Sequence, residues 1–271
     1  MRHPEVMRTE EERKRLDEAQ RQLFDHPAER VRSALDEFTR MLNGVYLPNW
    51  SELSQLLDAA SHNEELAIEL IQNVHSPIVR DDFERLLSRR LHNHLASTAS
   101  LVDHVRRIVK RLPSSVAPGF GARTDVLAQA PEVGFMRDLR NFTLHRALPF
   151  PGHKITISNM NTAKQEFESE VELSVQELLR WDRWSPSSRS FISAQGEAVR
   201  LRAVVDRQGQ LVWDHNIWLG QRMAEYVGAH VDEINKLRLG VVCAQFGVSP
   251  EVGRQMMVER AARDEVPPPF G

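Results

Sequence analysis

The stretch FMRDLRNFTLHRALP, residues 135–149, carries the apolar spacing around which the rest of the chain is organised. Phe135, Leu139 and Phe142 recur at helical intervals and fall within an arc of about 60° on a helix that turns about 100° per residue. Pro149 helps to stop the helix. The opposite face carries two arginines, an amide, a leucine and an imidazole, which are Arg137, Arg140, Asn141, Leu144 and His145. The stretch therefore predicts a short amphipathic helix with one buried face and one polar face.

Within this helix, the six residues 140–145 read RNFTLH, an arginine and a polar residue followed after three positions by a histidine. This pattern resembles the signature of the HEPN superfamily, named after its higher-eukaryote and prokaryote nucleotide-binding members. The flanking Leu139, Arg146 and Pro149 are similar to bacterial members of that superfamily. The resemblance covers the motif helix and, more loosely, the long helix before it. It implies a mainly α fold, a helical bundle of HEPN type, and metal-independent RNA cleavage in a bacterial toxin or defence system.

Composition is that of an ordinary globular chain. The 271 residues are 41% hydrophobic and 27% charged, with a net charge of −3 that does not favour nucleic-acid binding over the whole surface. Cys243 is the single cysteine, so no disulfide can form within the chain, which is typical of a reducing cytoplasm. No signal peptide and no apolar run long enough to span a bilayer is apparent. These features predict a cytoplasmic protein without membrane association.

Helical periodicity before the motif predicts a charged arm and then a bundle. The arm covers residues 1–26, and Pro27 begins a helix that ends at Gly44. Ser51 is the predicted N-cap of a third helix. A fourth helix follows Asn63 and ends at Ser76–Pro77. The longest pattern, 79–112, predicts the central helix of the bundle, packed beside the motif helix, with a loop and a short helix near 125–130 between them.

After the motif, alternating residues at 154–158 and 167–175 predict a small β-hairpin insertion, joined by a turn at 159–162. Further helices are predicted over 175–184, 188–195, 197–205 and 211–239. Trp181 and Trp184 fall in amphipathic patterns, which favours core positions over base stacking. One HEPN-like helical domain then covers 27–262, followed by a disordered tail at 263–271.

The motif residues suit RNA transesterification, in which a ribose 2′-hydroxyl attacks the adjacent phosphate. His145 is the predicted general acid or base, because histidine alone titrates near neutral pH without perturbation. Arg140 would stabilise the charge of the transition state, and Asn141 would position the imidazole or a phosphate oxygen. Arg137 and Arg146 are predicted to guide RNA phosphates. No cofactor and no metal is expected, since His92 and His94 are two residues apart and do not share a helix face.

Arg140 and His145 lie about 140° apart around one helix, so they flank its polar face rather than touch. One copy of the motif also offers a single histidine, whereas separate acid and base groups would need two. Two copies meeting across a twofold axis would supply two of each residue, and Leu144 would seal the contact. The sequence therefore predicts a homodimer with a composite site, whose partners are RNA and an antitoxin or other regulatory protein.

Three other interpretations remain open at this point. The motif face can be an ordinary solvated surface. The chain can be an inactive HEPN-fold module that dimerises or binds a nucleotide. Residues 239–252 also resemble the turn of a helix-turn-helix unit, which would make the chain a DNA-binding regulator. The simpler interpretation is a tight turn between two terminal helices. The second helix would have to contact bases, and its Met256, Met257 and Val258 are poorly suited to that.

Overall fold

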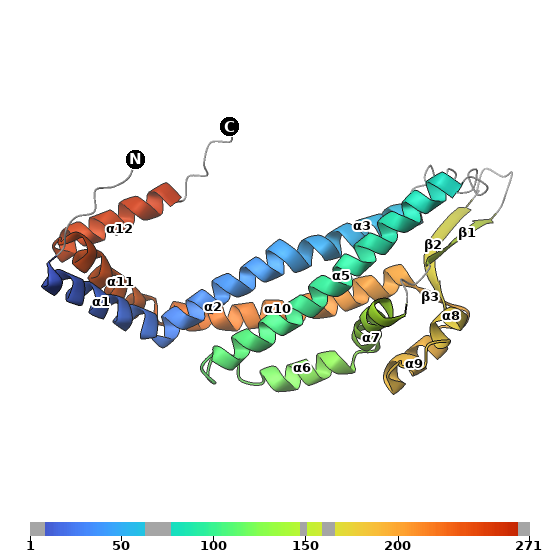
Figure 1. Cartoon of the computed structure of the whole chain (residues 1–271), viewed down its shortest axis with the longest axis horizontal. Helices are drawn as coiled ribbons and strands as arrows, with labels where there is room; N and C mark the ends of the chain where they lie inside the picture. The colour runs from blue at the N-terminus through green and yellow to red at the C-terminus, as the bar shows by residue number, and fades with distance from the viewer. Residues whose placement is uncertain (1–8, 63–76, 147–150, 159–165, 265–271) are drawn as a thin grey trace. The chain divides into compact units, whose positions relative to one another are not determined.

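Helices dominate the computed structural model, which describes residues 9–62, 77–146, 151–158 and 166–264 (Figure 1). The mainly α class is confirmed, and a small sheet accompanies the helices. Four predicted features lie outside the described residues: the helix after Asn63, the stop at Pro149, the hairpin turn and the end of the tail. The chain divides into two compact units, one formed by residues 1–36, 112–116 and 221–271 and the other by 37–111 and 117–220.

The first unit is built on contacts between two helices far apart in sequence, α1 (Glu10–Asp25) and α11 (Val231–Phe246). Thr9 begins α1 with a reciprocal cap, in which its Oγ1 accepts from Glu12 N at 3.2 Å while its own N–H donates to Glu12 Oε2 at 2.7 Å. Leu23 and Ile234 are buried together, which explains the few apolar positions of this charged helix.

The helix that begins at Pro27 does not end at Gly44, and this prediction was wrong. α2 (Pro27–Met41) continues through a π-helical turn, η1 (Leu42–Tyr46), into α3 (Leu47–His62). Pro48 has no N–H and would break a regular helix; the wider turn, in which Leu47 N–H donates to Leu42 O, accommodates it. Asn49 Nδ2 also donates to Val45 O at 2.7 Å. Ser51 therefore lies inside α3 and is no N-cap.

The long helix α5 (Pro77–Arg111) is the centre of the second unit, as predicted, and contacts both α3 and α7 (Figure 1). α6 (Phe120–Gln129) is longer than the short helix expected near 125–130. α7 (Pro131–His145) is the motif helix. α7 begins four residues before Phe135, because Pro131 provides the first helical residue.

One helix, α10 (Leu201–Ala229), replaces the two predicted over 197–205 and 211–239. The gap between the two predicted helices, 206–210, is helical in the structure, and Gly209 within it allows a close approach to α3. A Cβ at Gly209 would lie 2.1 Å from Trp50 Nε1 of α3. The chain breaks instead at His230, and α12 (Pro250–Asp264) follows α11 after the left-handed Gly247.

The predicted hairpin is present as β1 (Pro151–Ser158) paired antiparallel with β2 (Glu166–Ser174). A third strand, β3 (Ala198–Arg200), pairs with the end of β2, so the helix predicted from 197 was wrong at its start. Val199 is fully buried between exposed or half-buried neighbours, the alternation of a strand. Ser169 Oγ donates to Ala60 O at 2.7 Å, which attaches the sheet to the end of α3.

Two short helices close the second unit, α8 (Val175–Leu179) and α9 (Pro186–Ser193). Between them Trp181 and Trp184 are 7% and 5% exposed, which confirms their core positions. Trp184 Nε1 donates to Leu178 O at 2.7 Å, so its polar atom is satisfied in the core. This core is the surface on which the motif helix lies.

Candidate functional site

The apolar face of α7 is buried as predicted. Phe135 and Leu139 are fully buried and Phe142 is 5% exposed. Phe142 stacks on Trp184 with ring centroids 5.6 Å apart, and Phe135 stacks on the same indole at 5.8 Å. Three aromatic rings therefore fix the rotation of α7 about its axis, and this rotation decides where the motif side chains point.

A buried carboxylate holds the same helix from another direction. Asp138 is 6% exposed and accepts hydrogen bonds from the Ser185 hydroxyl and backbone N–H, at 2.5 and 3.1 Å, where α9 begins. Burial alone would raise the pKa of Asp138, but the hydrogen bonds from Ser185, Ser188 and Arg137 outweigh it and lower that pKa. Asp138 thus attaches α7 to the start of α9 at a position two residues before Arg140.

The motif side chains differ in exposure and in partners. Arg140 and Asn141 are half-buried, and His145 is exposed at the last residue of α7. Among the described residues, no carboxylate pairs with the Arg140 guanidinium. Arg137 instead donates from Nε to Asp138 Oδ1 at 3.2 Å. Arg146 is exposed at the end of α7.

Arg140 and Asn141 line a partly open cavity of about 310 Å³ whose other lining residues come from α5, α6, α7 and α10. Arg137 also lines it, whereas His145 does not. The structure thus brings Arg137, Arg140 and Asn141 to one cavity and leaves His145 beyond it. Leu144, beside His145, is 50% exposed. The polar face of α7 therefore has a concave part at Arg140 and an open part at its end.

The histidines of α5 lie elsewhere. His94 is fully buried, and its Nε2 lies 2.9 Å from Gln208 Oε1, while its Nδ1 has no hydrogen-bond partner among the described residues, so His94 is a core residue that is satisfied on one ring nitrogen. His92 is exposed, and His104 lies 3.6 Å from Glu37 Oε1. Within the described part of the chain, no group of three or more His, Cys, Asp or Glu side chains is arranged to hold a metal ion.

The C-terminal turn has the geometry of a helix stop. Gly247 adopts φ +64°, and Val248 N–H donates to Cys243 O at 3.3 Å. Gly253 of α12 packs so closely on α11 that an added Cβ would lie 2.9 Å from Leu239 Cδ1. These contacts fit a tight turn between the two terminal helices, and they add no support for the DNA-binding interpretation of residues 239–252.

Sequence reasoning missed the residues that form the far wall of the cavity, Gln208, His215 and Asn216 of α10. All three are buried polar residues, between 1% and 8% exposed. The sequence could have indicated them, because they share a face of the helix with the apolar Val205 and Val212. Polar side chains on a buried helix face usually have a partner or line a cavity.

Comparison of the chain with protein-family models, with curated proteins and with solved structures finds no match. None of the described helices is long and apolar enough to cross a membrane. The structure thus defines a mainly α protein with a three-stranded antiparallel sheet and a polar cavity wall on one amphipathic helix.

Proposed function

We propose that this chain is a metal-independent endoribonuclease of HEPN type that acts as a homodimer, with Arg140, Asn141 and His145 as its reactive residues. The observation that supports the proposal most is the state of Arg140. No described carboxylate neutralises its guanidinium. The helix that carries it is fixed by a buried aromatic cluster and by the Asp138–Ser185 hydrogen bond. An arginine that lines a cavity without a counter-charge is suited to bind phosphate oxygens.

The proposed chemistry divides the reaction between two side chains. The His145 imidazole removes or returns a proton as the ribose 2′-hydroxyl attacks the adjacent phosphate. The Arg140 guanidinium donates hydrogen bonds to the phosphate oxygens, whose negative charge increases in the transition state. The Asn141 amide orients the imidazole or a phosphate oxygen. The 2′-oxygen–phosphorus bond forms as the 5′-oxygen–phosphorus bond breaks, which leaves a 2′,3′-cyclic phosphate and a 5′-hydroxyl.

The spacing of the motif residues on α7 supports the proposed homodimer. His145 lies five positions after Arg140, which corresponds to about 7.5 Å along the helix and about 140° around it. A second copy of α7 across a twofold axis would set its own arginine against the first histidine. Leu144 is 50% exposed between these side chains and offers an apolar contact at the centre of such an interface. By the HEPN resemblance, the proposed setting is a bacterial toxin or defence system with an antitoxin or regulatory protein as partner.

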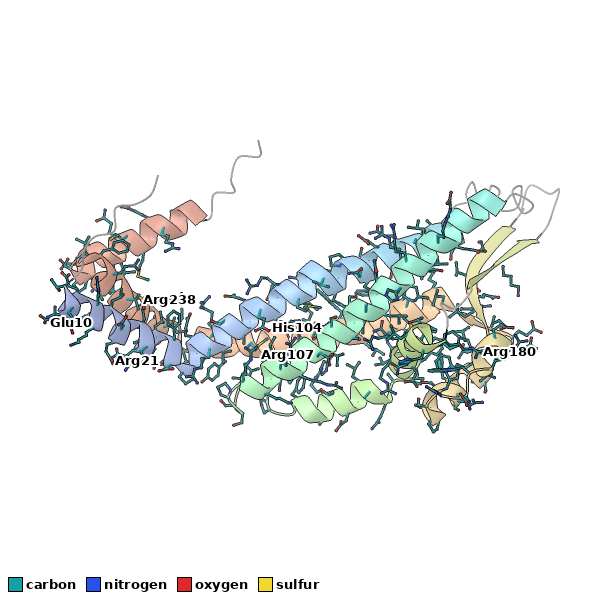
Figure 2. The ribbon with its side chains drawn as sticks, in the orientation of Figure 1. Glu10, Arg21, His104, Arg107, Arg180 and Arg238 are labelled. Carbon is teal, nitrogen blue, oxygen red and sulfur yellow. The ribbon has the colours of Figure 1, made fainter. Side chains whose placement is uncertain are left out.

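The test is incubation of the purified protein with bulk cellular RNA in excess chelator, beside Arg140→Ala and His145→Ala. Arg180→Ala is the matched control, because Arg180 is exposed just after α8, does not line the cavity and pairs with Glu177 at 2.6 Å (Figure 2). Chelator-resistant cleavage that disappears in both motif variants and persists in the control supports the proposal. A dimeric wild type that leaves RNA intact would favour an inactive interaction or nucleotide-binding module.

A further inference from the structure

The cavity beside the motif helix has apolar walls. Leu95 and Val102 of α5, Leu127 of α6, Met136 of α7 and Val212 of α10 all line it. A volume of about 310 Å³ lies at the lower end of the range of about 300–1,000 Å³ that ligand pockets span. The cavity can therefore enclose a compact apolar body, such as one aromatic ring system or a short alkyl chain.

The charge of the lining favours an anion. Three arginines and one aspartate line the cavity. Arg106 lies 3.6 Å from Asp103, and Arg137 lies 3.2 Å from Asp138, so two of the arginines have carboxylate partners. Arg140 has none among the described residues, and the amide of Asn141 adds a hydrogen-bond donor next to it.

His215 is the remaining titratable residue of the lining, and it carries no negative charge that would repel an anion. His215 is 8% exposed, and burial, followed by the nearby Arg123 charge, lowers its pKa, so its ring is neutral at neutral pH. Its neighbour Asn216 donates from Nδ2 to Val212 O at 2.7 Å, which fixes the amide in the wall. The α10 side chains that line the cavity are therefore uncharged, and Arg140 is the lining arginine that lacks a carboxylate partner among the described residues.

We infer that this cavity binds a small organic monocarboxylate with an apolar body, its carboxylate held by Arg140 and Asn141 and its body enclosed by α5, α6 and α10. The carboxylate would supply the counter-charge that Arg140 lacks, through two parallel N–H···O bonds. Since Arg140 also belongs to the proposed ribonuclease site, the bound acid would slow RNA cleavage; this last consequence, but not the binding, rests on the proposed function.

The test is calorimetric titration of the full chain with phenylacetate, indole-3-acetate and octanoate, each beside its neutral amide. The expected result is saturable binding of at least one acid, one per chain, about tenfold or more tighter than its amide, because one charge-assisted pair is lost in the amide. Acetate, which has the charge without the apolar body, should not bind measurably. Failure of all three acids to bind, or equal binding of acid and amide, overturns the inference.

Variants locate the site. Arg140→Gln should abolish the preference for acid over amide, while the matched control Arg107→Gln, on α5 but outside the lining, should retain it (Figure 2). Val102→Trp should block binding of every probe; Val102 is 38% exposed at the cavity, so the larger ring does not have to enter the core. A thermal unfolding scan of each variant verifies that it folds. An acid preference that survives Arg140→Gln, or binding that survives Val102→Trp, contradicts the inference.

The two proposals fail separately. A protein that binds the acid and leaves RNA intact retains the cavity ligand and loses the ribonuclease. A protein that cleaves RNA and binds none of the acids retains the ribonuclease and loses the cavity ligand. If both are correct, a saturating acid slows chelator-resistant cleavage, and its neutral amide does not.

Discussion

Ser185 Oγ donates a hydrogen bond to Asp138 Oδ2 across 2.5 Å and thereby joins the start of α9 to the middle of the motif helix. The two residues are 47 positions apart in sequence. Asp138 lies two residues before Arg140, so this bond fixes the part of α7 that carries the candidate site.

The first prediction concerns this bond. Asp138→Asn should lower the free energy of unfolding at neutral pH by about 1–3 kcal/mol, because a buried charged acceptor with several donors is removed. The folded-state pKa of Asp138 is lowered, so its stabilisation is present above the unfolded pKa of about 3.9 and is lost as the pH falls through the lower folded value. Urea unfolding at neutral pH and near pH 3 measures both.

The control for this prediction is Asp182→Asn, which changes an exposed aspartate between α8 and α9. Its effect should stay within about 0.5 kcal/mol. If Asp138→Asn is equally mild at neutral pH, the Ser185 contact does not hold α7 in place.

Close approach between α10 and α3 gives a second prediction. Gly209→Ala would place a Cβ 2.1 Å from Trp50 Nε1 and should destabilise the protein by about 1–3 kcal/mol through overpacking. Gly240→Ala, in the interior of α11 with nothing within 4 Å, should instead stabilise by about 0.5–1 kcal/mol. Trp50→Leu should reduce the cost of Gly209→Ala in a double-mutant cycle. Independent, additive effects of the two changes would contradict the contact.

His94 gives a third prediction. Burial lowers its pKa to about 4, against the opposing hydrogen bond with Gln208. An unfolded histidine binds its proton near pH 6.5, so between about pH 6.5 and about pH 4 the unfolded state binds more protons than the folded state. The free energy of unfolding should therefore fall by about 3 kcal/mol as the pH decreases through this window. The Tyr46 ring is 6.0 Å away, and burial raises its pKa, so it stays neutral throughout.

Denaturant unfolding across this pH range tests the assignment. His94→Gln should flatten the slope, and the residual slope should include His215, whose pKa is also lowered. His92→Gln, two residues earlier on the exposed face of α5, should leave the slope unchanged. An unchanged slope in His94→Gln would assign the pH dependence to other groups.

Periodicity predicted what depends on local sequence. The apolar positions of α5 and α7 gave correct helices and a correct buried face, and alternation at 154–158 located the hairpin. Errors occurred where a distant contact decided the outcome. Residues 206–210 were left between two predicted helices, whereas α10 runs through them with Gly209 packed against Trp50. The strand at Val199 forms because β2 is there to pair with it.

The candidate site was predictable only in part for the same reason. The exposed and buried faces of α7 follow from its spacing alone, so Arg140 and Asn141 could be assigned to the polar face. Asp138 lies in the same stretch, but its role requires Ser185, which is remote in sequence. The cavity likewise requires α10, whose Gln208 and Asn216 no pattern around the motif could indicate.

The composite site gives a fourth prediction. Arg140→Ala and His145→Ala chains are each expected to be inactive, but mixed dimers would contain one site with both residues intact, provided that arginine and histidine come from different copies. Mixing equal amounts after subunit exchange should restore up to about one quarter of wild-type cleavage, since about half of the dimers are mixed and each has one of two sites. Absence of recovery, despite demonstrated exchange, would place both residues of a site in one chain.

The last prediction concerns Leu144, which is 50% exposed at the end of α7. If it lies at the centre of the proposed twofold interface, Leu144→Asp buries two like charges against each other and should convert the dimer to a monomer. Stability of the monomer should change little, because the side chain is not part of the core. Sedimentation measures the mass, and the same variant should lose RNA cleavage together with dimerisation.

Val126→Asp is the matched control, because Val126 is 70% exposed on α6 and does not line the cavity. A dimer that persists in Leu144→Asp, or one that is lost equally in Val126→Asp, would mean that α7 does not meet its copy at Leu144, and the proposed pairing of Arg140 with a second His145 would then be wrong.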